Sequence, residues 1–163
     1  MQIKLLLSGD GGQGVQLVAD IICAAAFNAG HFVSFIPNYG LEQRGGVSLA
    51  FITVSDKEIS FAKFFRPDVM LILSDQADMR TERYQTKNIK ILNIKNYSDI
   101  FKQNNIAPRG YNIFFLGILA EFLEETKIVK AADIFILLEK KLGKKDEWEE
   151  NKRAFEIGKN IKY

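Results

Sequence analysis

Cysteine and histidine are almost absent from this chain, whose 163 residues include one of each, Cys23 and His31. A lone cysteine excludes an intramolecular disulfide, a zinc-finger ligand set and a self-contained iron–sulfur site. One histidine excludes a metal site built from several histidines, and no Ser/His/Asp or Cys/His arrangement surrounds it. Cys23 lies among alanines in a predicted helix and is interpreted as a small buried hydrophobe. We therefore expect neither a metal site nor a catalytic residue on this chain alone.

A strong charge and a long apolar run are also lacking. Net charge is only +2, from 22 Lys and Arg against 20 Asp and Glu, and no basic stripe favours nucleic acid. No apolar run approaches the ~20 residues that cross a bilayer, and the N-terminal residues do not resemble a signal peptide. A hydrophobic fraction of 47% is typical of a folded protein. We expect one cytoplasmic α/β domain over residues 1–163, with no nucleic-acid or membrane partner.

The spacing of apolar residues predicts an alternation of strands and helices. Strands are predicted at residues 3–7, 32–36, 47–55, 69–73 and 89–94. Helices are predicted between Gly14 and Gly30 and at residues 112–125, 131–142 and 144–161, with a short helix and loop over residues 76–87. Residues 1–37 match the start of a parallel βαβ unit, and residues 58–62 are expected to pair back onto residues 47–55. The predicted fold is a three-layer α/β/α domain with a mixed, largely parallel sheet and a Rossmann-like start.

The first candidate site is the glycine loop Gly9-Asp10-Gly11-Gly12-Gln13-Gly14, which fits the pattern GxGxxG between a predicted strand and a predicted helix. Glycines permit a tight turn, and the free N–H groups of the first helical turn suit an anion such as phosphate. A tight turn without a ligand, or packing against a partner chain, would need the same glycines. NAD and FAD are disfavoured, because residues 32–38 lack the acidic residue that holds a ribose and Asp10 adds negative charge.

The second candidate site is the polar loop Asn38-Tyr39-Gly40-Leu41-Glu42-Gln43-Arg44-Gly45-Gly46. The guanidinium of Arg44 offers a planar fork for a carboxylate or phosphate. Alternatively, Arg44 and Glu42 form a local surface ion pair, which would contribute little. Both loops follow predicted strands, so we expect them at the carboxyl edge of the sheet, where α/β proteins usually bind ligands. This convergence predicts a functional surface.

Together the two loops resemble the gamma subunit, or gamma domain, of 2-oxoacid:ferredoxin oxidoreductases. The resemblance rests on Gly9-x-Gly11-Gly12-Gln13-Gly14-Val15 and on Pro37-Asn38-Tyr39-Gly40-x-Glu42-x-Arg44-Gly45-Gly46. It continues through Pro67-Asp68-Val69, Asn112, Leu116-Gly117 and Asn151-x-x-Ala154-Phe155-x-x-Gly158, so it spans nearly the whole chain. The chain departs from the family at Asn38, where Ser or Thr is usual, and at Ser60-Phe61-Ala62, where Ser-Pro is usual.

This resemblance implies one subunit of an assembly that oxidatively decarboxylates a 2-oxoacid to an acyl-CoA and passes electrons to ferredoxin. The chain alone would hold no cofactor. Thiamine diphosphate, Mg, iron–sulfur clusters and CoA would belong to the assembled enzyme, with alpha, beta and ferredoxin-type delta subunits. The chain would act in assembly and in the approach of CoA or substrate, with Arg44 as an anion contact and Glu42 orienting it. The alternative is a free-standing phosphate- or nucleotide-binding module.

Overall fold

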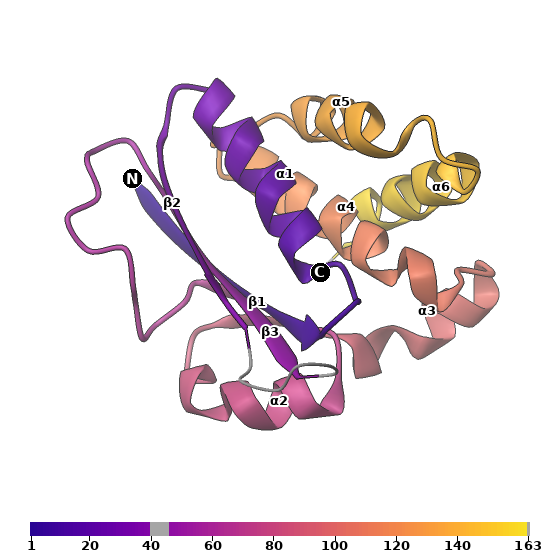
Figure 1. The fold of residues 1–163 in the computed structure, drawn as a ribbon, viewed down its shortest axis with the longest axis horizontal. Helices are drawn as coiled ribbons and strands as arrows, with labels where there is room; N and C mark the ends of the chain where they lie inside the picture. Colours follow the sequence, from indigo (N-terminus) through magenta and orange to yellow (C-terminus); the bar gives the residue numbers. More distant parts are fainter. Residues whose placement is uncertain (40–45, 163) are drawn as a thin grey trace.

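A computed structural model describes residues 1–39 and 46–162 and contains one five-stranded sheet (Figure 1). The strands are β1 (Gln2–Asp10), β2 (Phe32–Asn38), β3 (Val47–Ser55), β4 (Val69–Ile72) and β5 (Lys90–Asn93), arranged in the order β2-β3-β1-β4-β5. β3 is antiparallel to both β1 and β2, whereas β4 is parallel to β1 and to β5. Four strands therefore point in one direction and β3 opposes them, as expected for a mixed, largely parallel sheet.

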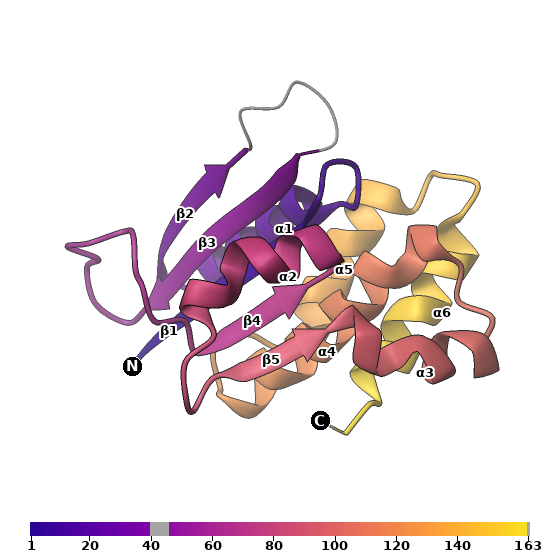
Figure 2. The same ribbon diagram turned by 90° about the horizontal axis from the view of Figure 1, so that it is seen from below.

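Helices cover both faces of this sheet. They are α1 (Val15–Asn28), α2 (Asp75–Thr81), α3 (Ser98–Gln103), α4 (Tyr111–Glu125), α5 (Ala131–Leu142) and α6 (Trp148–Lys159), with short 3-10 turns at Glu82–Tyr84, Ile94–Tyr97 and Pro108–Gly110. Figure 2 shows α2 on one face, while α1, α4, α5 and α6 lie on the other. The predicted three layers are confirmed, although the layer formed by α2 is the thinner one.

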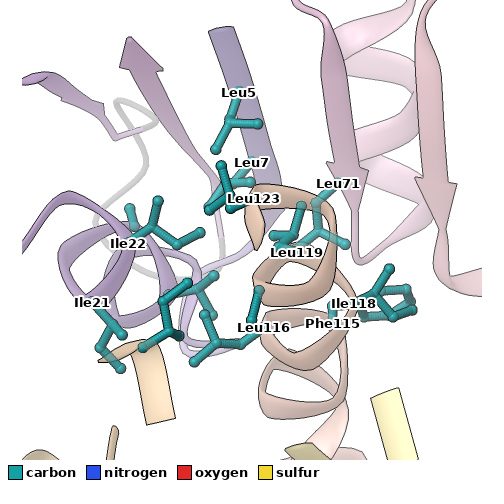
Figure 3. Close-up of a cluster of buried hydrophobic side chains, with 14 of the residues drawn as sticks. Leu5, Leu7, Ile21, Ile22, Leu71, Phe115, Leu116, Ile118, Leu119 and Leu123 are labelled. Carbon is teal, nitrogen blue, oxygen red and sulfur yellow. The ribbon is translucent and has the colours of Figure 1, made fainter. Parts of the chain in front are cut away.

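Most of the core lies between the sheet and the larger helical layer. Leu5 and Leu7 of β1 point toward Ile22 of α1 and toward Leu116 and Leu119 of α4 (Figure 3). All five side chains are completely buried. The opposite face carries a smaller cluster that includes residues of all three central strands, an alanine of α2 and two aromatic residues; its members are Leu6, Val47, Leu49, Phe51, Phe64, Met70, Ile72, Ala77 and Tyr84. β1 and β3 are thus covered on both faces, which explains their nearly continuous apolar sequences.

The predicted pairing of the strands was wrong in one respect. Residues 58–62 form no strand, and residues 47–55 pair instead with β1 and β2. β3 reverses direction after β2 and enters the sheet between β2 and β1, so these two strands run parallel without being neighbours. β1 and β3 each have nine residues, and this long pairing buries both strands more completely than a hairpin with the exposed Phe61 segment would. The sequence analysis also missed α3, which has only six residues and one buried side chain, Phe101.

Two glycines allow α4 and α6 to cross with their backbones in contact. A Cβ atom on Gly117 of α4 would lie 2.7 Å from the backbone nitrogen of Lys159. A Cβ atom on Gly158 of α6 would lie 2.8 Å from the carbonyl carbon of Phe114. Both glycines belong to motifs of the family resemblance, and their role in this fold is close helix packing.

No single helix within residues 1–39 and 46–162 has the length and apolarity needed to span a membrane. The segments Ile94–Gln103 and Pro108–Glu125 pass this test only as a pair, and they meet at an angle of 118°.

Candidate functional site

The two candidate loops meet at one edge of the sheet. The glycine loop links the end of β1 to the start of α1, and the backbone N–H of Gly11 donates to the carbonyl of Gly46 at 2.9 Å. This contact arises because β3, which follows the second loop, pairs directly with β1 and sets Asp10 opposite Val47. Asn38 ends β2 opposite Leu49 and is half-buried.

The structure describes only part of the second loop. Tyr39 is 66% exposed and Gly46 is half-buried beside the glycine loop. The other predicted site residues of this loop, Gly40, Glu42, Arg44 and Gly45, lie outside the described residues. Their roles stay predictions.

Side chains brace the glycine loop against the neighbouring strand. The backbone N–H of Asp10 donates to Oε1 of Gln13 at 2.7 Å, and Nε2 of Gln13 donates to the carbonyl of Leu73 at 3.1 Å. Oγ of Ser74 donates to Oδ1 of Asp10 at 2.7 Å and accepts from the N–H of Ala77 at 3.0 Å, which caps α2. The Asp10 carboxylate is therefore engaged by Ser74 at the start of α2, and the loop is anchored to the end of β4.

Conformation and space both require glycine in this loop. Gly12 and Gly14 have φ angles of +94° and +76°, in the left-handed region that favours glycine. A Cβ atom on Gly9 would lie 2.8 Å from Oε1 of Gln13, and a Cβ atom on Gly14 would collide with the side-chain amide of Asn112. Gly14 is also the N-cap of α1, so this helix begins without a capping side chain, and its first turn holds no acidic residue.

Beside the loop lies a cavity of about 500 Å³, which we call the glycine-loop pocket. It is lined by the loop, by the start of α4 and by apolar side chains: Gly12, Gln13, Gly14, Leu17, Leu73, Ile94, Pro108, Arg109, Tyr111 and Asn112. A second cavity of about 530 Å³, the α3 pocket, is lined by Ile94, Lys95, Ser98, Phe101, Lys102, Asn105, Ile106, Ala107 and Tyr111. The two pockets share Ile94 and Tyr111, so they adjoin at the carboxyl edge of β1, β4 and β5, and we call the pair the groove.

Charged groups at the rim of this groove are held by ion pairs. Nη2 of Arg109 lies 2.6 Å from Oε2 of Glu150, and this carboxylate raises the pKa of Arg109 above its ordinary value. Nζ of Lys95 lies 3.1 Å from Asp75 and 3.2 Å from Asp78, which together raise the pKa of Lys95. Lys102 also lines the groove, in the α3 pocket.

Asn112 is the site residue that local sequence reasoning missed. It was noted only as part of the family resemblance, yet it lines the glycine-loop pocket and is just 9% exposed. It stands almost 100 positions after Gly14, so no local spacing connects the two residues. The contact of its side-chain amide with the start of α1 becomes visible only in the folded chain.

Neither metal binding nor thiol chemistry is supported by the residues that the structure describes. No group of three or more His, Cys, Asp or Glu in residues 1–39 and 46–162 could hold a metal ion. Burial, aided by the nearby Asp20 charge, raises the pKa of the Cys23 thiol to about 12. Because the thiolate is the reactive form, Cys23 is not a nucleophile at neutral pH.

Comparison with known proteins identifies the family. Residues 4–87 match the family model described as pyruvate ferredoxin/flavodoxin oxidoreductase. The chain is 30% identical to the 2-oxoglutarate synthase subunit KorC of Archaeoglobus fulgidus, over 96% of this chain and 86% of that protein. The fold matches the keto/oxoacid ferredoxin oxidoreductase gamma subunit of Geobacter sulfurreducens with a TM-score of 0.75 at 19% identity, covering 97% of this chain and 94% of that one.

A longer protein contains the same fold. The 2-oxoglutarate:ferredoxin oxidoreductase of Magnetococcus marinus matches with a TM-score of 0.80 at 20% identity, over 97% of this chain but only 30% of that one. The family model covers the glycine loop and the second loop, on which the resemblance was based. This chain belongs to the pyruvate ferredoxin/flavodoxin oxidoreductase family, as a gamma-type subunit.

Proposed function

We propose that this gamma-type chain acts in the assembly of a 2-oxoacid:ferredoxin oxidoreductase and in the approach of CoA to its reaction centre. The assembled enzyme would decarboxylate a 2-oxoacid oxidatively to an acyl-CoA and pass the electrons to ferredoxin. Alpha, beta and ferredoxin-type delta subunits would hold thiamine diphosphate, Mg and the iron–sulfur clusters. This division of labour agrees with the donor set of the described residues, which offers neither a cysteine cluster nor a group of metal ligands.

The groove along the carboxyl edge of the sheet is the observation that supports this role. At one end, the glycine loop and Leu17 in the first turn of α1 line the glycine-loop pocket. Ile94 and Tyr111 line the middle, and Lys95 and Lys102 line the far end. CoA combines phosphate groups with a long and largely uncharged arm, so such a groove suits its chemistry. The similar protein from Magnetococcus marinus is described with 2-oxoglutarate, CoA and succinyl-CoA bound.

The chain's own residues would bind and orient, while the cofactors of the other subunits supply the reaction chemistry. Arg44 would contact an anionic group, and Glu42 would orient its guanidinium. Tyr39, which is largely exposed at the same edge, would contact a partner subunit or substrate. In this arrangement the loop edge faces the rest of the enzyme, and the glycine loop anchors that edge to the sheet.

The test uses the reconstituted enzyme and the isolated chain. We expect Arg44→Ala to raise the KM for CoA, or to weaken co-purification with the other subunits, roughly tenfold to a hundredfold, since a charge-assisted hydrogen bond contributes about 1.5–3 kcal/mol. The melting temperature of the isolated chain should stay within a few degrees. Arg80→Ala, on the exposed surface of α2, is the matched control and should change neither property.

A second variant separates the two parts of the proposal. Lys102→Ala in the α3 pocket should raise the KM for CoA and leave subunit association unchanged, because Lys102 lies in the groove rather than in the loops. If both variants leave CoA kinetics and assembly unchanged, the proposed role is wrong. A chain that binds nucleotides and never associates with other subunits would support the free-standing module instead.

A further inference from the structure

We propose that the glycine-loop pocket binds a small oxyanion, a phosphate or a carboxylate, between the first turn of α1 and the side-chain amide of Asn112. This inference rests on the proposed function, because that function places an anionic substrate in the groove. It goes further by assigning the position of the anion and by identifying the Asn112 amide as one of its hydrogen-bond donors.

The start of α1 supplies the first set of hydrogen-bond donors. The first N–H groups of any α-helix lack acceptors within the helix. Here the N-cap is Gly14, which has no side chain to accept from them, and the first turn holds no acidic residue. Within the described residues, the N–H groups of Gly12 and Gly14 also have no acceptor. The helix dipole adds a partial positive charge at this end, so these donors favour an anion.

Asn112 is the second, independent observation. Its residue is 9% exposed, and its side chain makes no hydrogen bond within residues 1–39 and 46–162. The side-chain nitrogen is the atom that a Cβ on Gly14 would meet first, so the amide lies directly against the start of α1. Asn112 also lines the glycine-loop pocket, so its unpartnered amide is accessible to a ligand there. A bound oxyanion would accept from this amide and from the helix at once.

The other residues around the pocket are suited to a small anion that is held by neutral hydrogen-bond donors. Arg109, the one cationic residue among the described residues that line this pocket, forms an ion pair with Glu150 at 2.6 Å, so part of its charge is already balanced. The Asp10 carboxylate, which would repel an anion, is bonded to Ser74 on the α2 side. Leu17, Leu73 and Pro108 line the rest of the pocket, and such apolar walls strengthen hydrogen bonds from neutral donors.

A ligand-binding role and a structural role predict different effects of replacing Asn112. If the amide exists to bind a ligand, it makes no hydrogen bond to the other described residues of the free chain whose loss would weaken the fold. The apolar variant Asn112→Leu, of similar size, would then remove no stabilising hydrogen bond. We expect its melting temperature to equal that of the wild type within about 2 °C. A structural asparagine would instead lower the melting temperature when replaced.

The experiment is a titration of the 15N-labelled full-length chain with inorganic phosphate, with chloride at equal ionic strength as the reference. The amide signals of Gly12, Gly14 and Val15 should shift and saturate with phosphate but not with chloride. A parallel titration with 2-oxoglutarate distinguishes the two sources, because the preferred group saturates the same signals at a lower concentration. Phosphate should also raise the melting temperature, since a ligand that binds only the folded state stabilises it.

The variants complete the test. Asn112→Leu should weaken the apparent affinity about tenfold or more. Asn28→Leu, at the opposite end of α1 and exposed, is the matched control and should keep the affinity of the wild type. The inference is overturned if neither anion shifts these signals more than chloride does, if Asn112→Leu binds as well as the wild type, or if Asn112→Leu melts several degrees lower. Because the titration needs no other subunit, it can fail while the proposed assembly role holds, and the reverse is equally possible.

Discussion

Gly158→Ala tests whether the backbone contact between α4 and α6 limits the stability of this fold. The new Cβ atom would lie 2.8 Å from the carbonyl carbon of Phe114 and 3.2 Å from its Cα, and its oxygen would be closer still. These are backbone atoms of a buried helix, so no flexible side chain can move aside. The two helices must separate, which would loosen Phe155, a side chain that is 99% buried and lies at the same crossing.

The expected destabilisation follows from two opposing effects. Overpacking of a well-packed core typically costs about 1–3 kcal/mol, and backbone atoms place this site at the upper end of that range. Alanine returns up to ~1 kcal/mol through its better helix propensity. The net loss is therefore about 2 kcal/mol, which for a chain of this size lowers the melting temperature by roughly 4–8 °C.

Thermal denaturation of the isolated chain, followed by circular dichroism, is the assay. The matched control is Gly110→Ala at the start of α4, where φ is −98° and the nearest atoms, Ile106 Cγ2 and Ala154 Cβ, lie at ordinary contact distances of 3.4 and 3.6 Å. It should leave the melting temperature unchanged or raise it slightly. The double variant Gly117→Ala with Gly158→Ala should cost less than the sum of its parts, since the first Cβ already separates the helices. A melting temperature for Gly158→Ala within 1 °C of the wild type would refute this reasoning.

Three other measurements test the chemistry assigned to this chain. The purified chain should turn over no 2-oxoacid, show no iron–sulfur absorbance and bind NAD or FAD weakly at most; a coloured preparation or micromolar NAD affinity by calorimetry would contradict this. Cys23 should resist iodoacetamide at pH 8 and react only after unfolding, because burial raises its pKa to about 12; rapid labelling of the native chain is the contrary result. Gln85, with Lys95 and Asn93, holds the pKa of Asp78 below its ordinary value. That stabilisation is present above the unfolded pKa of about 3.9 and is lost as pH falls through the lower folded pKa. Between pH 5 and pH 3 the wild type should therefore lose more thermal stability than Asp78→Asn does, and equal losses would refute this.

The elements of the fold were predictable because their signals are local. β3 and α5 have the predicted bounds, Val47–Ser55 and Ala131–Leu142. The first is a continuous apolar run, as expected for a strand covered on both faces, and the second has a helical apolar period that ends at a glycine. Gly30, the predicted end of the first helix, follows α1 and has a φ angle of +90°, in the left-handed region common after a helix end.

The order of the strands could not be predicted in the same way. Whether β2 or β3 lies beside β1 depends on contacts between residues some 45 positions apart, such as Leu6 opposite Phe51. A parallel βαβ start and an antiparallel insertion between its strands have the same local pattern. Only the burial gained by the long β1–β3 pairing decides between them, and that is a property of the whole sheet.

The glycine loop shows the same division between local and distant causes. Gly12 has open space where a Cβ would be, so its glycine is required by its φ angle of +94° alone. Gly14 also has a positive φ, but it is required as well by the amide of Asn112, which occupies the place of its missing side chain. A GxGxxG pattern shows which positions require glycine but not why they require it. The residue that imposes the requirement at Gly14 lies on another helix. Phosphate binding by this loop is therefore not a property of the six loop residues alone. It depends as well on the asparagine that packs against the last glycine, and a chain with the same loop but an apolar residue at position 112 should bind an anion there about tenfold more weakly or worse.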